Sequence, residues 1–416
     1  MLNEYGFPSV DPHLRVCADC FEDEGLKNYV SAHASSLKCA FCGARSKHDT
    51  AAPLDEVVDH MRSCLAKDYN NPDDAGMVYE TAEGGYQGEV WDTREFVQWE
   101  LGLELPNDKD DKLLDAICDG LGDQLWCSAH LYSLGPHEAL AYSWCTFCSL
   151  VKHKHRYFFT RHTRDSDDRE LLSPSELLRT IVQFARDSGL VRTLPAGQTY
   201  FRARRQYPGT ALAQPHELGP PPPKKAAQSR MSPAGIVMMY VSEDAPTALH
   251  ETANEVGTYA IGTFRTRRDI RILDLAELPP VPSLFEEISD TLEYDPRRNL
   301  IFLHRLAHDI SRPIARDDRI HIDYVPTQVV TEYVRSARFP DGRLDGIRYK
   351  SSRRDGGVSV VLFADQMNVV GAGTEGYAGR KSDQWLELVN CTNQTVSQAL
   401  LNSITANAAK VDEDDE

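Results

Sequence analysis

The residues best suited to metal chemistry are four cysteines near the start of the chain, spaced C-x2-C-x18-C-x2-C. They are Cys17, Cys20, Cys39 and Cys42. A two-residue spacing lets both thiolates of a pair face one ion, and two such pairs complete the tetrahedral shell that zinc prefers. Because four protein ligands leave no open position, we expect a structural rather than a catalytic zinc ion.

A cluster of arginines in the second half of the chain could bind an anion. The run Tyr200–Arg205 reads YFRARR and ends a predicted strand, which places Arg202 and Arg204 on one face and Arg205 on the other. Guanidinium groups match phosphate oxygens in bidentate fashion. A solvated edge strand would explain the same pattern, so the spacing alone leaves both interpretations open.

A carboxylate and two hydroxyl groups follow at positions suited to a pocket. Asp244, with Pro246 behind it, predicts a helix start, and Glu251 falls two turns into that helix. Ser351 and Ser352 stand where a strand gives way to a turn, with arginines beside them. A carboxylate in such a pocket can stabilise positive charge that develops on a bound ligand.

The elements that must position these residues alternate between strand and helix patterns. A serine cap, a proline and Glu176 predict a helix over 174–187, and a helical period also runs through 111–126. Apolar, β-branched runs predict strands, and amphipathic segments between them predict helices, which together favour an α+β fold. The predicted strands cover 198–201, 236–241, 260–264, 270–273 and 358–363, and the helices cover 245–255, 297–311 and 326–337.

Four separated blocks of the second half resemble the RES domain, a family of NAD-degrading toxins whose fold is similar to that of ADP-ribosyltransferases. The blocks are YFRAR, SRMSPAGIVMMYVSEDAPTALHE, DYVPTQVVTEYVR and DGIRYKSSRRDGGVSVVLF. The first half resembles the HEPN-like region attached to some RES domains, through the cysteine knuckle, the residues 83–86 and SWCTFCSLVKHKHRYFF.

The RES resemblance implies roles for single residues. It makes Glu251, Arg202 and Ser351 the catalytic set, and Arg202, Arg230, Tyr240 and Ser351 the residues that bind the dinucleotide. Tyr240 would pack on the nicotinamide ring. The neighbouring Ser352 leaves the choice of serine open.

These observations together predict five regions. We expect a zinc knuckle over 1–55, a helical HEPN/RES-type region over 56–165 and a linker helix over 166–194. A mixed α/β RES catalytic domain over 195–370 follows, and then a C-terminal helix and acidic tail over 371–416.

The composition restricts the location and the partners. The chain has 416 residues and a formal net charge of 45 − 63 = −18, which disfavours general nucleic-acid binding. The N-terminus lacks the pattern of a signal peptide, and no apolar run is long enough to cross a bilayer, so we expect a cytoplasmic protein without membrane contact. The expected ligands are structural Zn²⁺, NAD⁺ as substrate and inorganic phosphate; an antitoxin or immunity protein and a second copy of the chain are candidate partners.

The leading hypothesis is an enzyme that cleaves the bond between nicotinamide and ribose by phosphorolysis or hydrolysis, acting as a toxin or defence effector. One alternative is an ADP-ribosyltransferase that uses the same pocket. Another is a HEPN-type ribonuclease or nucleic-acid sensor with a regulatory RES domain, because Arg156 and His162 fit the R-x4–6-H pattern.

Overall fold

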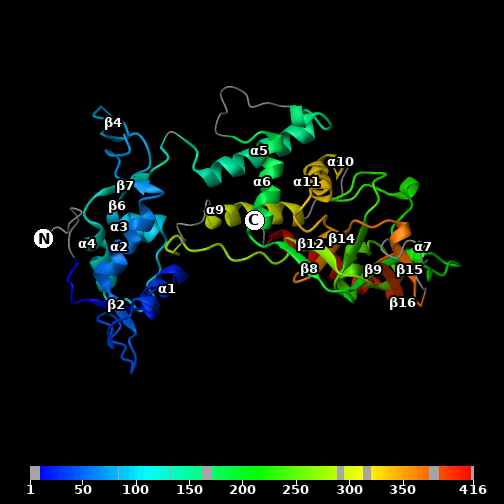
Figure 1. Ribbon diagram of the computed structural model, residues 1–416, viewed down its shortest axis with the longest axis horizontal. Helices are drawn as coiled ribbons and strands as arrows, with labels where there is room; N and C mark the ends of the chain where they lie inside the picture. Colours follow the sequence, from blue (N-terminus) through cyan, green and yellow to red (C-terminus); the bar gives the residue numbers. More distant parts are fainter. Residues whose placement is uncertain are drawn as a thin grey trace. The chain divides into compact units, whose positions relative to one another are not determined.

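The computed structural model describes residues 10–82, 84–131, 133–161, 171–287, 295–312, 320–373 and 384–413. The chain forms two compact units, each made of two segments (Figure 1). The first unit contains Met1–Glu138 and Pro280–Arg298, and the second contains Ala139–Pro279 and Asn299–Glu416. Among the described residues, no helix has both the length and the apolar character needed to cross a membrane.

The first unit is built from short strands and helices around one apolar cluster. The antiparallel strands β1 (Arg15–Cys17) and β2 (Ala51–Pro53) pack with helices α1 (Glu24–Ala32), α2 (Leu54–Leu65) and α4 (Lys112–Leu121). Its remaining elements are η1 (Ala18–Cys20), β3 (Tyr69–Asn70), β4 (Tyr79–Glu80), β5 (Gly85–Tyr86), β6 (Trp91–Asp92), α3 (Thr93–Glu95), the π-helical turn η2 (Phe96–Glu100) and β7 (Leu125–Ser128).

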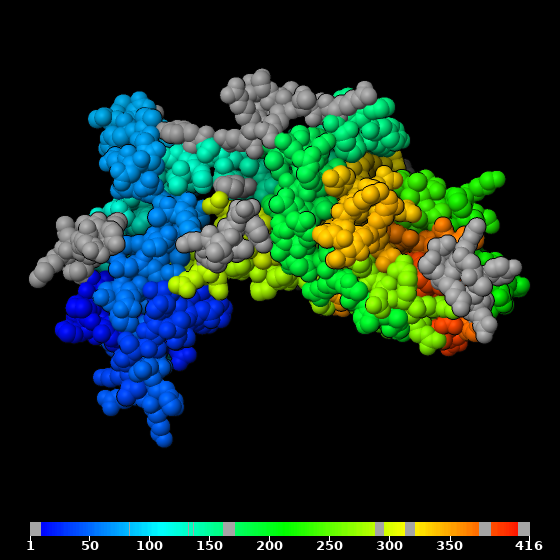
Figure 2. All heavy atoms as spheres, in the orientation of Figure 1, coloured from blue at the N-terminus to red at the C-terminus, as the bar shows by residue number. Residues whose placement is uncertain are grey.

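The later segment of the first unit packs directly on its helices. The Ser283 hydroxyl donates to the carboxylate of Asp23, which also caps α1, and His60 Nε2 lies 2.8 Å from the Phe285 carbonyl oxygen. Gly25 permits this approach, because a Cβ there would lie 2.6 Å from the Phe285 carbonyl carbon. The yellow-green segment therefore lies against blue residues in both views (Figures 1 and 2).

The second unit is organised by a nine-stranded mixed sheet with the order β15-β16-β11-β9-β10-β14-β13-β12-β8. The β15–β16 and β12–β13 pairs are parallel, and the other neighbours are antiparallel. The strands are β8 (Val191–Leu194), β9 (Thr199–Gln206), β10 (Met239–Ser242), β11 (Gly257–Thr266), β12 (Ile270–Asp274), β13 (Gly346–Lys350), β14 (Val358–Leu362), β15 (Val369–Gly371) and β16 (Leu386–Val396).

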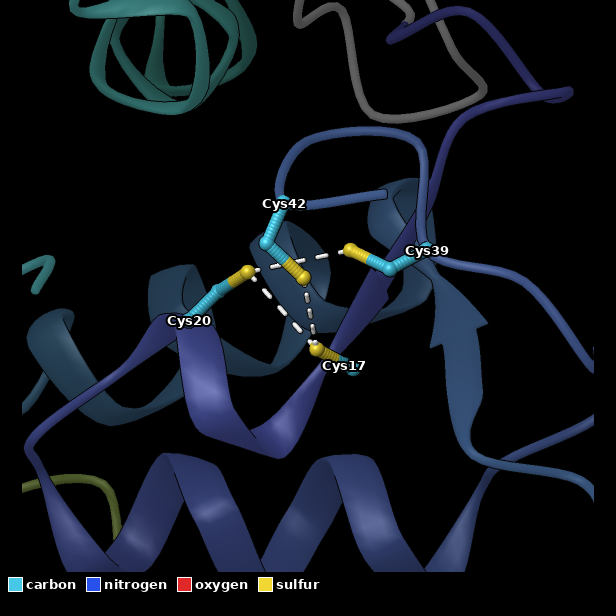
Figure 3. A group of neighbouring side chains, drawn as sticks. All are labelled: Cys17, Cys20, Cys39 and Cys42. Carbon is cyan, nitrogen blue, oxygen red and sulfur yellow. Dashed lines mark hydrogen bonds between the residues drawn. The ribbon is translucent and has the colours of Figure 1, made fainter. Parts of the chain in front are cut away.

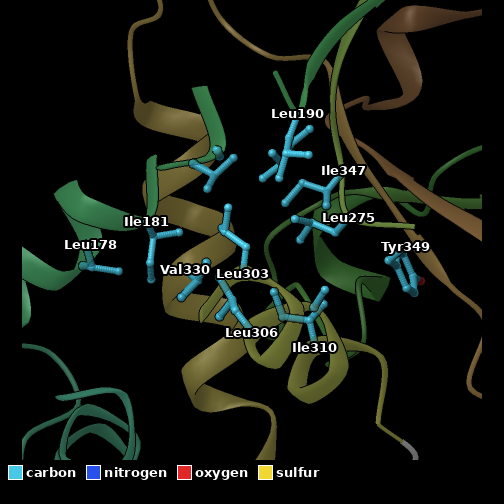
Figure 4. Packing of buried hydrophobic residues seen from close by; sticks show 14 of the residues in the cluster. Leu178, Ile181, Leu190, Leu275, Leu303, Leu306, Ile310, Val330, Ile347 and Tyr349 are labelled. Carbon is cyan, nitrogen blue, oxygen red and sulfur yellow. The ribbon is translucent and has the colours of Figure 1, made fainter. Parts of the chain in front are cut away.

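Helices bury one part of this sheet in the largest apolar cluster of the chain. Leu303 and Ile310 of α9 (Pro296–Ser311) meet Ile181 of α6 (Pro174–Asp187), Val330 of α11 (Val325–Ser336) and Ile347 of β13 (Figure 4). The helix α5 (Pro136–His153) contributes Trp144, Phe147 and Val151 to the same cluster. Burial of this many apolar side chains is the main stabilising term of the unit.

A second group of helices packs around the other end of the sheet. Ile404 of α12 (Gln398–Glu413) and Leu249 of α8 (Ala245–Thr252) are buried with Ala203 of β9 and Ile261 of β11. The remaining elements of the unit are η3 (Phe159–Arg161), α7 (Pro215–Leu218), η4 (Pro223–Lys225), α10 (Ile320–Asp323) and η5 (Gln366–Asn368).

Most elements expected from the sequence are present, but some bounds differ and several strands were not expected. The helix over 174–187 has the expected bounds and capping box, and Gly189 ends it at φ +69°. The strand expected over 236–241 begins at Met239 and ends at Ser242. The helix expected over 111–126 ends at Leu121, because Gly122 adopts φ +92° and β7 follows. The strands β8, β15 and β16, and the short strands β3–β7 of the first unit, were not expected from the sequence.

Leu303→Ala should destabilise the second unit by about 2–5 kcal/mol, because Leu303 is fully buried among apolar side chains of three elements. The free energy of unfolding in urea measures this effect. Met367→Ala is the control, since Met367 is 63% exposed, and it should change the free energy by less than about 0.5 kcal/mol. Equal effects of the two substitutions would contradict this packing.

Candidate active site and cysteine cluster

The four cysteines expected to bind zinc lie together in the first unit. Their sulfur atoms are all within 4.8 Å of one another, and no other metal-binding group of three or more such residues occurs among the described residues. The Cys17–Cys20 and Cys20–Cys39 sulfur pairs are 3.7 Å apart, and the Cys17–Cys42 pair is 3.5 Å apart (Figure 3). A tetrahedral zinc ion with Zn–S bonds of about 2.3 Å needs sulfur separations of about 3.8 Å, so this cluster could bind such a metal.

The local backbone favours a thiolate at one of the four cysteines, Cys39, while burial and the neighbouring cysteines raise the pKa of Cys17 and Cys20 in the absence of a metal. Gly43 adopts φ +76° directly after the second cysteine pair, a conformation suited to glycine in a tight turn. Hydrogen bonds from Cys20 and from backbone N–H groups lower the pKa of Cys39 to about 4. A thiolate that accepts N–H groups is the protonation state that a metal ligand requires.

Cys39→Ser should reduce the zinc content of the purified protein and lower the melting temperature of the first unit, because a structural zinc site contributes directly to folding. Metal analysis by mass spectrometry and a thermal melt measure the two effects. Cys118→Ser is the control, since Cys118 lies outside the cluster. Unchanged zinc content in Cys39→Ser would show that these four thiols do not hold the metal.

The second unit contains a large cavity where its sheet divides. Strands β9 and β10 share one residue pair, Phe201 with Ser242, while β9 continues along β11 and β10 continues along β14. Residues on both sides of this junction, Phe201–Arg204 on one side and Met238 with Tyr240–Ser242 on the other, line a cavity of about 970 Å³. This volume suits a ligand at the upper end of the usual small-molecule range.

The cavity is strongly cationic although the whole chain is acidic. Among the described residues, five cationic side chains line it against one carboxylate, that of Glu251. The cations are Arg202, Arg204, Lys225, Arg230 and Arg353. Such an excess in a protein of net charge −18 favours an anionic ligand.

The structure brings four of the five expected site residues into this one cavity. Arg202, Arg230, Tyr240 and Glu251 all line it. The fifth, Ser351, is only 5% exposed and donates a hydrogen bond of 2.6 Å to Glu251 Oε1. The neighbouring Ser352 does line the cavity and accepts from Arg230 at 3.2 Å. The two serines thus contact different members of the site.

Glu251 is placed by the last turn of α8, and α8 is tied to the loop that carries Ser351. The Asp244 carboxylate caps α8 by accepting from the Thr247 N–H at 2.8 Å, and it also pairs with Arg354 at 3.2 Å. His250 Nδ1 lies 3.3 Å from the Arg353 carbonyl oxygen, and burial lowers the pKa of His250. These contacts fix the carboxylate and the Ser351 hydroxyl relative to each other.

Arg202 and Arg204 point to the same side of β9, as the strand alternation predicts. Arg202 donates to the carbonyl oxygens of Leu218, at 2.8 Å, and Gly219, and Arg204 donates to that of Glu217. Burial and the positive charge of Arg204 lower the pKa of Arg202 to about 10, so its guanidinium remains charged at neutral pH.

Arg230 is held by the end of a helix and by an aromatic ring. It donates to the carbonyl oxygens of Ile310, at 2.8 Å, and Arg312, at 2.5 Å, beside the C-terminus of α9. Cations are favoured at this end of a helix. The guanidinium carbon lies 5.6 Å from the centre of the Tyr324 ring, within the range of a cation–π interaction.

Tyr240 contributes its ring to the cavity wall and its hydroxyl to the loop that carries Arg230. The hydroxyl oxygen accepts from the Met231 N–H at 3.1 Å and lies 3.0 Å from the Ser232 hydroxyl. Burial raises the pKa of Tyr240, so the phenol stays neutral. The stacking on nicotinamide expected from the sequence stays a prediction.

Two buried polar residues of α11 also support this loop, and neither was expected from the sequence to do so. Gln328 donates to the Ser229 carbonyl oxygen at 2.9 Å, and Thr327 donates to the Arg230 carbonyl oxygen at 2.6 Å. Their exposures of 7% and 5% show that they lie on the packed face of the helix. The sequence could have indicated them as polar residues at positions of an amphipathic helix where apolar residues are expected.

Comparison with known families agrees with this geometry. The model of the RES domain matches residues 199–380, and the model of HEPN/RES N-terminal domain 1 matches residues 32–165. The chain is a RES domain protein with a HEPN/RES N-terminal domain 1. No curated protein and no solved structure shows a match to the chain.

The RES match covers all the described cavity residues except Thr405. Arg202, Arg230, Tyr240, Glu251 and Ser351 fall inside it, and Thr405 is contributed by α12 beyond its end. The RES family is associated with NAD⁺-degrading toxin activity. In the other half, the HEPN-like pattern includes His162, which lies outside the described residues.

Proposed function

We propose that this RES domain protein cleaves the N-glycosidic bond between nicotinamide and ribose in NAD⁺. The observation that supports this most directly is the carboxylate of Glu251, which Ser351 holds in a cavity whose other charged residues, in the part of the chain that the structure describes, are five cations. An anionic dinucleotide with a cationic sugar–base bond matches that distribution of charge. A fold similar to ADP-ribosyltransferases, as the family resemblance implies, is part of the same proposal.

In the proposed complex, Arg202 and Arg230 bind the diphosphate. Both guanidinium groups lie in the cavity wall, and no carboxylate pairs with either of them among the described residues. Guanidinium groups offer five donors in a planar fork, so each can keep its backbone contacts and still donate to phosphate oxygens.

The chemistry requires little acid catalysis. The bond between ribose C1′ and the nicotinamide nitrogen breaks, its electron pair leaves with the neutral nicotinamide, and positive charge develops on the sugar. Glu251 stabilises that charge through the ribose hydroxyls, and an oxygen of phosphate or water then forms the new bond to C1′. A proton lost from the attacking water or phosphate passes to solvent.

Glu251→Ala should lower the rate of nicotinamide release by about 10²–10³-fold, because it removes the carboxylate that stabilises the transition state. Chromatographic measurement of free nicotinamide after incubation with NAD⁺ gives this rate. The far-UV circular dichroism spectrum should stay the same as that of the wild type. Full activity in a folded Glu251→Ala protein would contradict the role of this carboxylate.

Arg202→Ala should raise the KM for NAD⁺ by about tenfold or more, because a charge-assisted contact to phosphate is lost. Arg205→Ala is the matched control from the same strand. Arg205 lies on the opposite face, does not line the cavity and pairs with Glu255. The assignment of the diphosphate to the Arg202 side of β9 would be wrong if both variants raised KM equally at unchanged stability.

The products identify the acceptor. Mass spectrometry of reactions with and without inorganic phosphate should show ADP-ribose 1″-phosphate if phosphate attacks, and ADP-ribose if water attacks. Labelled ADP-ribose attached to a macromolecule would instead indicate an ADP-ribosyltransferase with the same pocket. In the proposed biological role the enzyme is a toxin or defence effector, restrained by an antitoxin or immunity protein.

A further inference from the structure

A second hydroxyl group reaches the carboxylate oxygen that Ser351 contacts. The Ser359 hydroxyl lies 3.4 Å from Glu251 Oε1, in addition to the 2.6 Å contact from Ser351. Ser359 comes from strand β14, whereas Ser351 comes from the loop after β13, so two separate elements approach one atom. Ser359 also lines the cavity.

The sheet fixes Ser359 and supplies it with a partner. Ser359 and Ser242 are directly opposite in the antiparallel β10–β14 pair, and their hydroxyl oxygens lie 3.3 Å apart. Both residues are 2% exposed and stand in otherwise apolar strands. Burial of hydroxyl groups is costly unless they are hydrogen-bonded, so their contacts with each other and with Glu251 account for their presence there.

The two carboxylate oxygens of Glu251 therefore differ in their hydrogen-bond partners. Oε1 accepts from Ser351 and Ser359, while Oε2 has no hydrogen-bond partner in the part of the chain that the structure describes. A carboxylate rotates broadly about its terminal bond, and two donors on one oxygen restrict that rotation. Oε2 is then the oxygen that remains for the ribose hydroxyls.

We propose that Ser359, supported by Ser242, is a positioning residue that orients Glu251 so that Oε2 faces the sugar. This inference rests on the proposed NAD⁺ cleavage and adds to it a residue of β14 and the oxygen that acts. Because Ser359 would act through Glu251 on the transition state, its loss should lower kcat and leave the KM for NAD⁺ nearly unchanged.

Ser359→Ala should lower kcat for nicotinamide release by about tenfold, with KM within about twofold of the wild type. Ser359→Thr keeps the hydroxyl and should recover most of that loss. Ser242→Ala removes only the supporting contact and should lower kcat by about threefold. Ser143→Ala is the matched control, because Ser143 is a hydrogen-bonded serine of the same unit, 1% exposed, that does not line the cavity.

A double variant distinguishes positioning from general loss of stability. Since Ser351 and Ser359 donate to the same oxygen, Ser351→Ala combined with Ser359→Ala should not reduce kcat by the product of the two single effects. Thermal melts of all variants show whether each protein is folded. If Ser359→Ala does not fold, the Ser242→Ala and Ser359→Thr results decide the question by the same kcat criterion.

The outcomes separate this inference from the function on which it rests. A wild-type protein that releases nicotinamide, together with folded Ser359→Ala and Ser242→Ala proteins of unchanged kcat, would overturn only the role of Ser359. A rise in KM without a fall in kcat would also overturn it, because it would place Ser359 in substrate binding. A wild-type protein that leaves NAD⁺ intact would overturn both the proposed function and this role.

Discussion

The candidate site depends on a single shared residue pair between β9 and β10. Phe201 and Ser242 join the two halves of the nine-stranded sheet, and each strand then follows a different neighbour. A continuous ladder at this point would bring the backbones to about 4.8 Å and leave no room for a ligand. The ladder stops here, and residues of both strands, among them Arg202 and Tyr240, line the cavity.

Around that division, backbone carbonyl groups hold the cations and hydroxyl groups hold the anion. Arg202 contacts carbonyl oxygens after α7, and Arg230 contacts those at the end of α9. Glu251 is held by neutral hydroxyl groups. Among the described residues, no arginine forms an ion pair with it. This separation leaves the positive charges available to an anionic ligand and the carboxylate available to the sugar.

The sequence is most informative where structure is determined locally. The helix over 174–187 was predictable because a capping box and Gly189 specify its ends, and the cysteine spacing was sufficient because both pairs must face one point. The strand β16 was missed because its residues 389–395 are mostly exposed and polar, and its pairing with β11 determines it. The buried polar contacts of the site were not predictable because they join residues far apart in the sequence. Ser359 lies 117 residues from Ser242 and 108 residues from Glu251, and Gln328 lies 99 residues from Ser229.

The segment Pro280–Arg298 belongs to the first unit although residues of the second unit precede and follow it in the sequence, and this limits how the chain can be divided. This segment lies inside the residues matched by the RES domain, yet it contacts Asp23 and His60 of the first unit. No single break in the polypeptide can therefore yield two fragments that each retain all their packing partners. Insertions, deletions and gene fusions that treat the two matched regions as interchangeable modules would have to preserve two junctions at once.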